Sequence, residues 1–201
     1  MKPVWNILLV SILAAPVALR ADTYKVSVNT SALAAGSYTL AFEFTDGSGT
    51  DDANNTATIN NLDFGGGSVS NSAVFCGGDP CSASGDVTSG FSIADSSFYN
   101  FLEQQFTPGN ALSFMVSLTN YSDSGGTPDE FSFYIEELAT TDTVGGSLLT
   151  IDIGGAVTPY SSSQTGTTSV ASASAVPEPG TFTLLLAGLA GLANKRLHRV
   201  R

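Results

Sequence analysis

The sequence predicts an all-β protein, a single antiparallel β-sandwich or jelly-roll-like domain between an N-terminal signal peptide and a short C-terminal hydrophobic helix. Two observations predict the domain. From Thr23 to about Tyr160, apolar and polar residues alternate with a period of two, and clusters of Gly, Pro, Asp and Ser separate the alternating runs. These runs are, in order, 24–28, 38–44, 56–64, 87–93, 112–118, 131–135 and 149–153.

One segment departs from this alternation. In Ser97–Phe106, apolar residues recur at every fourth position, which predicts a helical turn. The aromatic run Phe98–Phe101 inside it has two interpretations, rings that fill the core or rings exposed for stacking on sugars. We favour core filling, because the single tryptophan, Trp5, lies in the signal peptide and the body lacks this common sugar-stacking residue.

The N-terminal segment Met1–Ala21 has the three parts of a secretory signal peptide. Lys2 supplies the charge, Val4–Leu13 is the apolar stretch, and small residues follow up to Ala21. The stretch is shorter than the 20 or so residues that a permanent membrane anchor needs. We expect cleavage after Ala21, with a break after Ala18 as the alternative.

Two cysteines, Cys76 and Cys81, flank a turn of two glycines, an aspartate and a proline. An even cysteine count in an exported chain indicates a disulfide, and this one would staple a small loop. A metal site would need two further ligands, and a redox pair normally has the Cys-x-x-Cys spacing. We therefore predict a structural Cys76–Cys81 bridge.

The charge is distributed unevenly along the chain. The sequence has 7 Lys and Arg residues against 18 Asp and Glu, a formal net charge of −11. Residues 22–176 hold 17 of the acids and one cation, Lys25, so their charge is −16 (1 − 17). A body with one cationic side chain cannot neutralise a phosphate backbone, which excludes nucleic acid as a partner.

The body offers no set of residues typical of a catalytic site. The single histidine, His198, lies in the C-terminal tail, so the body has no histidine to act as the base in Ser-His-Asp or Cys-His catalysis. Glu136 and Glu137 are neighbours in a predicted strand and point to opposite faces, so they cannot flank one glycosidic bond. We predict no catalytic residues and a protein that is not an enzyme; a hydrolase would need other acids to meet in space.

One loop has the oxygen-rich, glycine-punctuated composition of a calcium site. It carries Asp46, Asp51 and Asp52, but it has no Gly at the sixth position and no closing Glu, as an EF-hand loop would. A solvated hairpin loop is the preferred interpretation. We therefore predict no metal or other cofactor, with Ca²⁺ bound by these three aspartates as the alternative.

Beyond the predicted domain at 22–160, residues 161–175 are rich in Ser and Thr, which predicts a flexible linker. The tail 176–201 has three parts: a Pro-Glu-Pro motif, the uncharged run Thr181–Ala193 and a basic end. As a helix the uncharged run would be about 20 Å long, short of a bilayer core of about 30 Å. The motif is Val176, Pro177, Glu178 and Pro179, and the basic end carries Lys195, Arg196, Arg199 and Arg201.

This order of parts resembles the PEP-CTERM sorting signal of exported Gram-negative bacterial proteins. The resemblance implies recognition by an exosortase, a membrane transpeptidase that would cut near Pro177–Pro179 while the basic tail holds the precursor in the inner membrane. The body also resembles an uncharacterised group of PEP-CTERM proteins, through the segments starting at Tyr24 and Pro108. This second resemblance implies no activity.

We therefore predict a non-enzymatic exported protein of the cell surface or extracellular matrix, associated with exopolysaccharide or biofilm. The alternative is a carbohydrate-binding β-sandwich module that retains extracellular polysaccharide. The expected partners are the secretion machinery, the exosortase, extracellular polysaccharide and, before processing, the membrane through the C-terminal segment.

Overall fold

The computed structural model describes residues 21–49, 51–70, 74–75, 82–120, 126–138 and 143–173. Within these ranges the chain forms β-strands and no helix. The strands are β1 (Ala21–Asn29), β2 (Tyr38–Thr45), β3 (Thr56–Asp63), β4 (Ser68–Val69), β5 (Val74–Phe75), β6 (Ala83–Asp86), β7 (Gly90–Ala94), β8 (Tyr99–Thr107), β9 (Ala111–Thr119), β10 (Glu130–Glu137), β11 (Leu149–Asp152), β12 (Val157–Pro159) and β13 (Thr168–Ser172).

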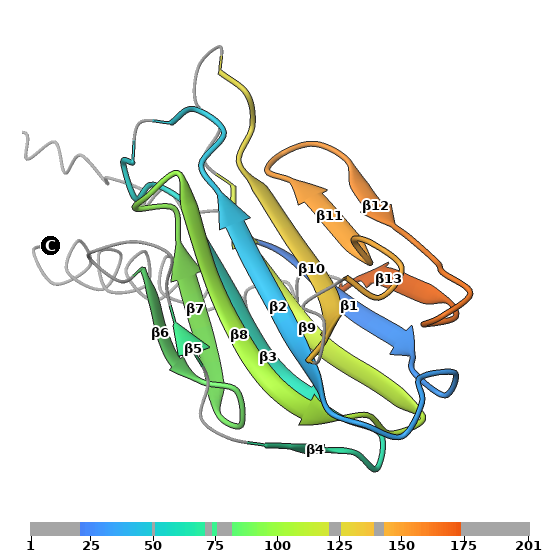
Figure 1. Cartoon of the computed structure of the whole chain (residues 1–201). Helices are drawn as coiled ribbons and strands as arrows, with labels where there is room; N and C mark the ends of the chain where they lie inside the picture. Colours follow the sequence, from blue (N-terminus) through green and yellow to red (C-terminus); the bar gives the residue numbers. More distant parts are fainter. Residues whose placement is uncertain are drawn as a thin grey trace, which may run out of the picture.

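The strands form two antiparallel sheets that pack face to face (Figure 1). Sheet A has the order β13-β1-β9-β3-β7-β6, and sheet B has the order β12-β11-β10-β2-β8-β4, with β5 also paired to β8. Neighbours in a sheet are often distant in sequence, as in β2 between β8 and β10. The predicted antiparallel β-sandwich is confirmed.

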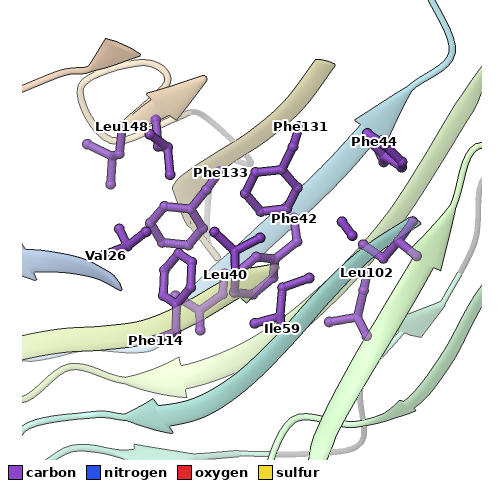
Figure 2. Packing of buried hydrophobic residues seen from close by; sticks show 14 of the residues in the cluster. Val26, Leu40, Phe42, Phe44, Ile59, Leu102, Phe114, Phe131, Phe133 and Leu148 are labelled. Atoms are coloured by element: carbon purple, nitrogen blue, oxygen red, sulfur yellow. The ribbon is translucent and has the colours of Figure 1, made fainter. Parts of the chain in front are cut away.

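The core lies between the sheets and consists mainly of aromatic and aliphatic side chains from alternate strand positions (Figure 2). Phe42 on β2 is fully buried. The centre of its ring lies 5.1 Å from the ring centre of Phe91, 5.3 Å from that of Phe114 and 5.0 Å from that of Phe133. Phe91 and Phe114 belong to sheet A, and Phe133 belongs to sheet B. The rings therefore join the two layers, as the period of two in the sequence predicts.

The helical turn predicted for Ser97–Phe106 is wrong. The segment is β8, which pairs with β2 from Tyr99 opposite Thr45 to Phe106 opposite Tyr38. Residues four positions apart share one face of a strand as well as one face of a helix, so that spacing alone could not distinguish the two.

The flexible linker predicted for residues 161–175 is also different in the structure. Ser162 and Gly166 form a small hairpin bridge, and Thr168–Ser172 form β13 at the edge of sheet A. Thr165 and Thr168 are buried, and β13 pairs with β1 over five residues. The sandwich thus extends from the predicted boundary at 160 to residue 173, because an edge strand needs few apolar residues and tolerates a polar composition.

Several predicted features lie outside the described residues. They are the signal peptide up to residue 20, the Cys76–Cys81 bridge, the linker residues 174–175 and the tail 176–201. In the part of the chain that the structure covers, no helix has the length and apolar character needed to cross a membrane.

The two ends of the described body meet at one end of sheet A. Because β1 and β13 are antiparallel, Tyr24 lies opposite Ser172, and the N–H of Ala173 donates to the carbonyl of Thr23 (2.8 Å). The start of β1 and the end of β13 are therefore neighbours.

Candidate functional site

The outward side of sheet B is the surface on which polar and aromatic side chains gather; we call it the outer face. Alternation on each strand determines its members, since residues between the core positions point away from sheet A. Pairing then aligns them in rows, one of which runs Ser132, Glu43, Phe101 across three strands. The outer face comprises Thr39, Ala41, Glu43, Thr45, Tyr99, Phe101, Glu103, Gln105, Glu130, Ser132, Tyr134, Glu136, Thr150 and Asp152.

None of the rings of Phe98–Phe101 belongs to the core, since Phe98 and Tyr99 are exposed and Phe101 is half-buried, so the core-filling interpretation is wrong. Phe98 is 62% exposed in the turn before β8, and Tyr99 is 40% exposed. Tyr99 and Phe101 both lie on the outer face, and the centres of their rings are 5.6 Å apart. Only Asn100 of this run points inward, where its side-chain amide donates to the carbonyls of Phe44 and Ser97.

Glu43 is the polar centre of the outer face. Its Oε1 accepts hydrogen bonds from the hydroxyls of Tyr99 and Tyr134, and its Oε2 accepts one from Ser132 (3.3 Å). Burial, and then the hydrogen bond to Glu43, raises the pKa of Tyr99 to about 12, and the same causes raise the pKa of Tyr134. Both phenols therefore remain protonated donors, and they hold the Glu43 carboxylate in place between the rings.

Four more carboxyl groups lie on the outer face: Glu103, Glu130, Glu136 and Asp152. The pKa of Glu130 is raised by burial, then by the charges of Asp152 and Glu43, and the pKa of Glu136 is raised by burial, then by Glu103 and Glu43. No Lys or Arg lies on this face, since Lys25, on the outward side of β1 in sheet A, is the one such residue in the described ranges. The face thus carries uncompensated negative charge.

The loop with Asp46, Asp51 and Asp52, for which a calcium site was the alternative interpretation, is held by hydrogen bonds to Asp46. Asp46 is fully buried, and its carboxylate accepts the hydroxyl of Ser48 and the N–H groups of Gly49 (2.8 Å) and Asp51 (2.6 Å). These hydrogen bonds lower the pKa of Asp46 against the opposing effect of burial. Asp51 and Asp52 are exposed, and no group of three or more His, Cys, Asp or Glu residues in the described ranges could hold a metal ion.

A second acidic cluster, which the sequence analysis missed, is buried at one end of the sandwich. Asp95 follows β7, Asp129 precedes β10, and their carboxyl groups hydrogen bond to each other. The Asn55 N–H donates to both Asp95 oxygens (3.2 and 3.1 Å), and its side-chain amide donates to Asp129 Oδ2 (2.7 Å). Burial, and then the hydrogen bond to Asp129, raises the pKa of Asp95 to about 7.

Two grooves in the described surface are lined by residues that do not belong to the outer face. One, of about 360 Å³, lies beside Gly36, Tyr38 and Leu138, and another, of about 460 Å³, lies beside Asn29 and Asn110. Neither gathers several titratable side chains.

Comparison with known proteins identifies the tail. Residues 175–199 match the family model described as the PEP-CTERM protein-sorting motif. The chain carries a PEP-CTERM sorting signal. A PEP-CTERM signal marks an exported protein with a membrane-anchored precursor that an exosortase processes, as the tail's resemblance implies. No curated protein and no solved structure matches the chain.

The PEP-CTERM signal begins close to the folded body. The match starts at residue 175, and the last described residue, Ala173, is hydrogen bonded to β1. Since residues 161–173 belong to the sandwich, little chain separates the body from the sorting motif.

Proposed function

We propose that this chain is a non-enzymatic protein of the cell surface or extracellular matrix that retains exopolysaccharide on the outer face of sheet B. The observation that carries the proposal is the pair of rings on the outer face, the exposed Tyr99 and the half-buried Phe101, beside the fixed carboxylate of Glu43. The PEP-CTERM signal supports the location, because it marks an exported protein.

The chemistry of the outer face supports sugar binding. An aromatic ring packs against the C–H groups of a sugar ring, while carboxylates and hydroxyls accept and donate hydrogen bonds to the sugar's own hydroxyls. Neighbouring strands are about 4.8 Å apart and outward residues along a strand about 7 Å apart, so the face offers repeated contacts to a chain of sugars.

The composition of the body supports a binding role rather than catalysis. The single histidine of the chain lies in the tail, and Glu136 and Glu137 alternate along β10, so that Glu136 alone belongs to the outer face. The phenols of Tyr99 and Tyr134 and the hydroxyl of Ser132 hold Glu43 in a network of hydrogen bonds, as expected of a group that orients a ligand.

A glycan array probed with the purified exported protein tests sugar binding. We expect specific binding to at least one polysaccharide, and replacement of either ring, Tyr99→Ala or Phe101→Ala, should weaken it about tenfold or more, since one ring contact is worth about 1.4 kcal/mol. Leu138→Ala is the matched control, because Leu138 is equally exposed (40%) but does not belong to the outer face. Binding that survives both ring substitutions, or no binding to any glycan, would refute the proposal.

The site of processing has its own test. We propose that the mature protein ends near Pro177–Pro179 and lacks Thr181–Arg201, because two prolines keep the motif extended and accessible in front of the apolar run. Glu178→Ala should leave export intact and give a heavier, membrane-bound form, whereas Glu137→Ala should be processed normally. Intact-mass analysis of the surface fraction decides the matter: a surface product that retains Lys195 and Arg196 would show that the tail is an ordinary anchor.

A further inference from the structure

The charge of the outer face restricts which polysaccharide it can hold. Its five carboxyl groups, Glu43, Glu103, Glu130, Glu136 and Asp152, lie on four neighbouring strands, and no cationic side chain of the described residues lies among them. Glu130 and Asp152 are directly opposite each other on paired strands, an arrangement of like charges that destabilises a sheet. A polymer of uronic acids or sulfated sugars would add to this repulsion, and a cationic polymer would relieve it.

The position of the rings adds a second requirement. Phe101 is paired with Glu43 in the register of β8 and β2, and Glu43 is hydrogen bonded to Tyr99. A sugar stacked on these rings therefore has a carboxylate directly beside it. A carboxylate has about four acceptor sites, so Glu43 can accept a ligand N–H in addition to its bonds from Tyr99, Tyr134 and Ser132. An ammonium group on the sugar would also be attracted to the ring faces.

We propose that the outer face binds a polysaccharide of amino sugars that carry free ammonium groups, with Tyr99 and Phe101 stacking on the sugar rings and Glu43 accepting from an ammonium group. The proposal rests on the proposed sugar-binding function and adds the class of polymer. The other carboxylates of the face, Glu103 and Glu130 among them, supply the charge that selects a cationic chain over an acidic one.

Calorimetric titration of the purified exported protein with three oligosaccharides of equal length tests this proposal. The three are a glucosamine oligomer, its fully N-acetylated counterpart and a uronic-acid oligomer, measured at pH 5.5 in low and high salt. The glucosamine oligomer should bind at least tenfold tighter than the N-acetylated one, and high salt should reduce that preference. The uronic-acid oligomer should not bind.

Variants assign the preference to the face. The double variant Glu43→Gln with Glu130→Gln should bring the two amino-sugar oligomers within about twofold of each other, because glutamine keeps an acceptor but removes the charge. The double variant Asp63→Asn with Asp86→Asn, which removes two negative charges from β3 and β6 in sheet A, is the matched control and should preserve the preference. If this control weakens binding as much as the variant of the outer face, net charge explains the attraction and the inference is wrong.

The remaining outcomes separate this inference from the proposed function. Equal affinity for the acetylated and free oligomers, lost in Tyr99→Ala, would overturn the amino-sugar class but support sugar binding. Tighter binding of the uronic-acid oligomer would do the same. Failure of all three oligomers to bind would overturn the class, and the glycan array would then decide the function itself.

Discussion

Replacement of Phe42 by alanine is expected to lower the free energy of unfolding by about 3–5 kcal/mol, a large part of the stability of a domain of this size. The side chain is fully buried, and its ring contacts Phe91 and Phe114 in sheet A and Phe133 in sheet B. Because these rings come from both layers, the cavity left by alanine cannot close by the movement of one neighbour. Chemical denaturation followed by tyrosine fluorescence measures the loss.

Phe98→Ala is the control for this experiment. Phe98 is 62% exposed, so its loss should change the free energy of unfolding by no more than about 0.5 kcal/mol. A loss below about 1.5 kcal/mol for Phe42→Ala would mean that the rings do not form the tightly packed centre that the structure places between the sheets.

Asp95→Asn is expected to raise the melting temperature at pH 8 by about 5 °C. For a domain of this size, that shift corresponds to an increase of about 2 kcal/mol in the free energy of unfolding. The pKa of Asp95 is about 7 in the fold and 3.8 for the unperturbed side chain. Below pH 3.8 both states are protonated, so stability is full; between pH 3.8 and 7 the unfolded state releases a proton that the folded state keeps, and stability falls. Asparagine, which cannot ionise, retains an acceptor for the Asn55 N–H and a donor for Asp129.

The advantage of Asp95→Asn over the wild type should therefore grow from about pH 4 to pH 7 and then stay constant. Asp86→Asn is the control, because hydrogen bonds from Thr88 lower the pKa of Asp86, so that its charge favours the folded state. Thermal melts at half-unit steps of pH measure both variants. A wild type whose stability relative to Asp95→Asn does not change with pH would show that Asp95 and Asp129 do not share a proton in the interior.

The alternation of apolar and polar residues predicts the two-layered fold, but it does not predict every strand or the end of the domain. Around Phe42 and around Phe133, apolar residues occupy every second position. This alternation predicts half-buried strands, whatever the order of the strands in the sheet. The spacing of Phe98, Leu102 and Phe106 fits a strand as well as a helix, so it predicts a helical turn where the structure has β8. The Ser- and Thr-rich composition of the last segment does not predict β13, because this edge strand is stabilised by backbone pairing with β1, which does not depend on apolar side chains.

The candidate site depended on information that sequence does not hold. Tyr99 and Phe101 are visible as aromatic residues, but their exposure follows from the phase of β8 against β2, which places Asn100 and Leu102 inside instead. The meeting of Tyr99 with Tyr134 at Glu43 joins three strands that are far apart in the chain. The same holds for Asp95 and Asp129, which are buried together because each lies at a strand end on the same side of the sandwich.

The pairing of β1 with β13 links folding to the order in which the chain is exported. The first strand leaves the cell early, and its edge partner, centred on residues more than a hundred positions later, leaves almost last. Sheet A therefore cannot acquire its final strand while any of the body remains inside, which keeps the domain incomplete during translocation. The PEP-CTERM signal starts at residue 175, immediately behind this strand. A body released at the sorting motif has thus already received the segment that completes its fold.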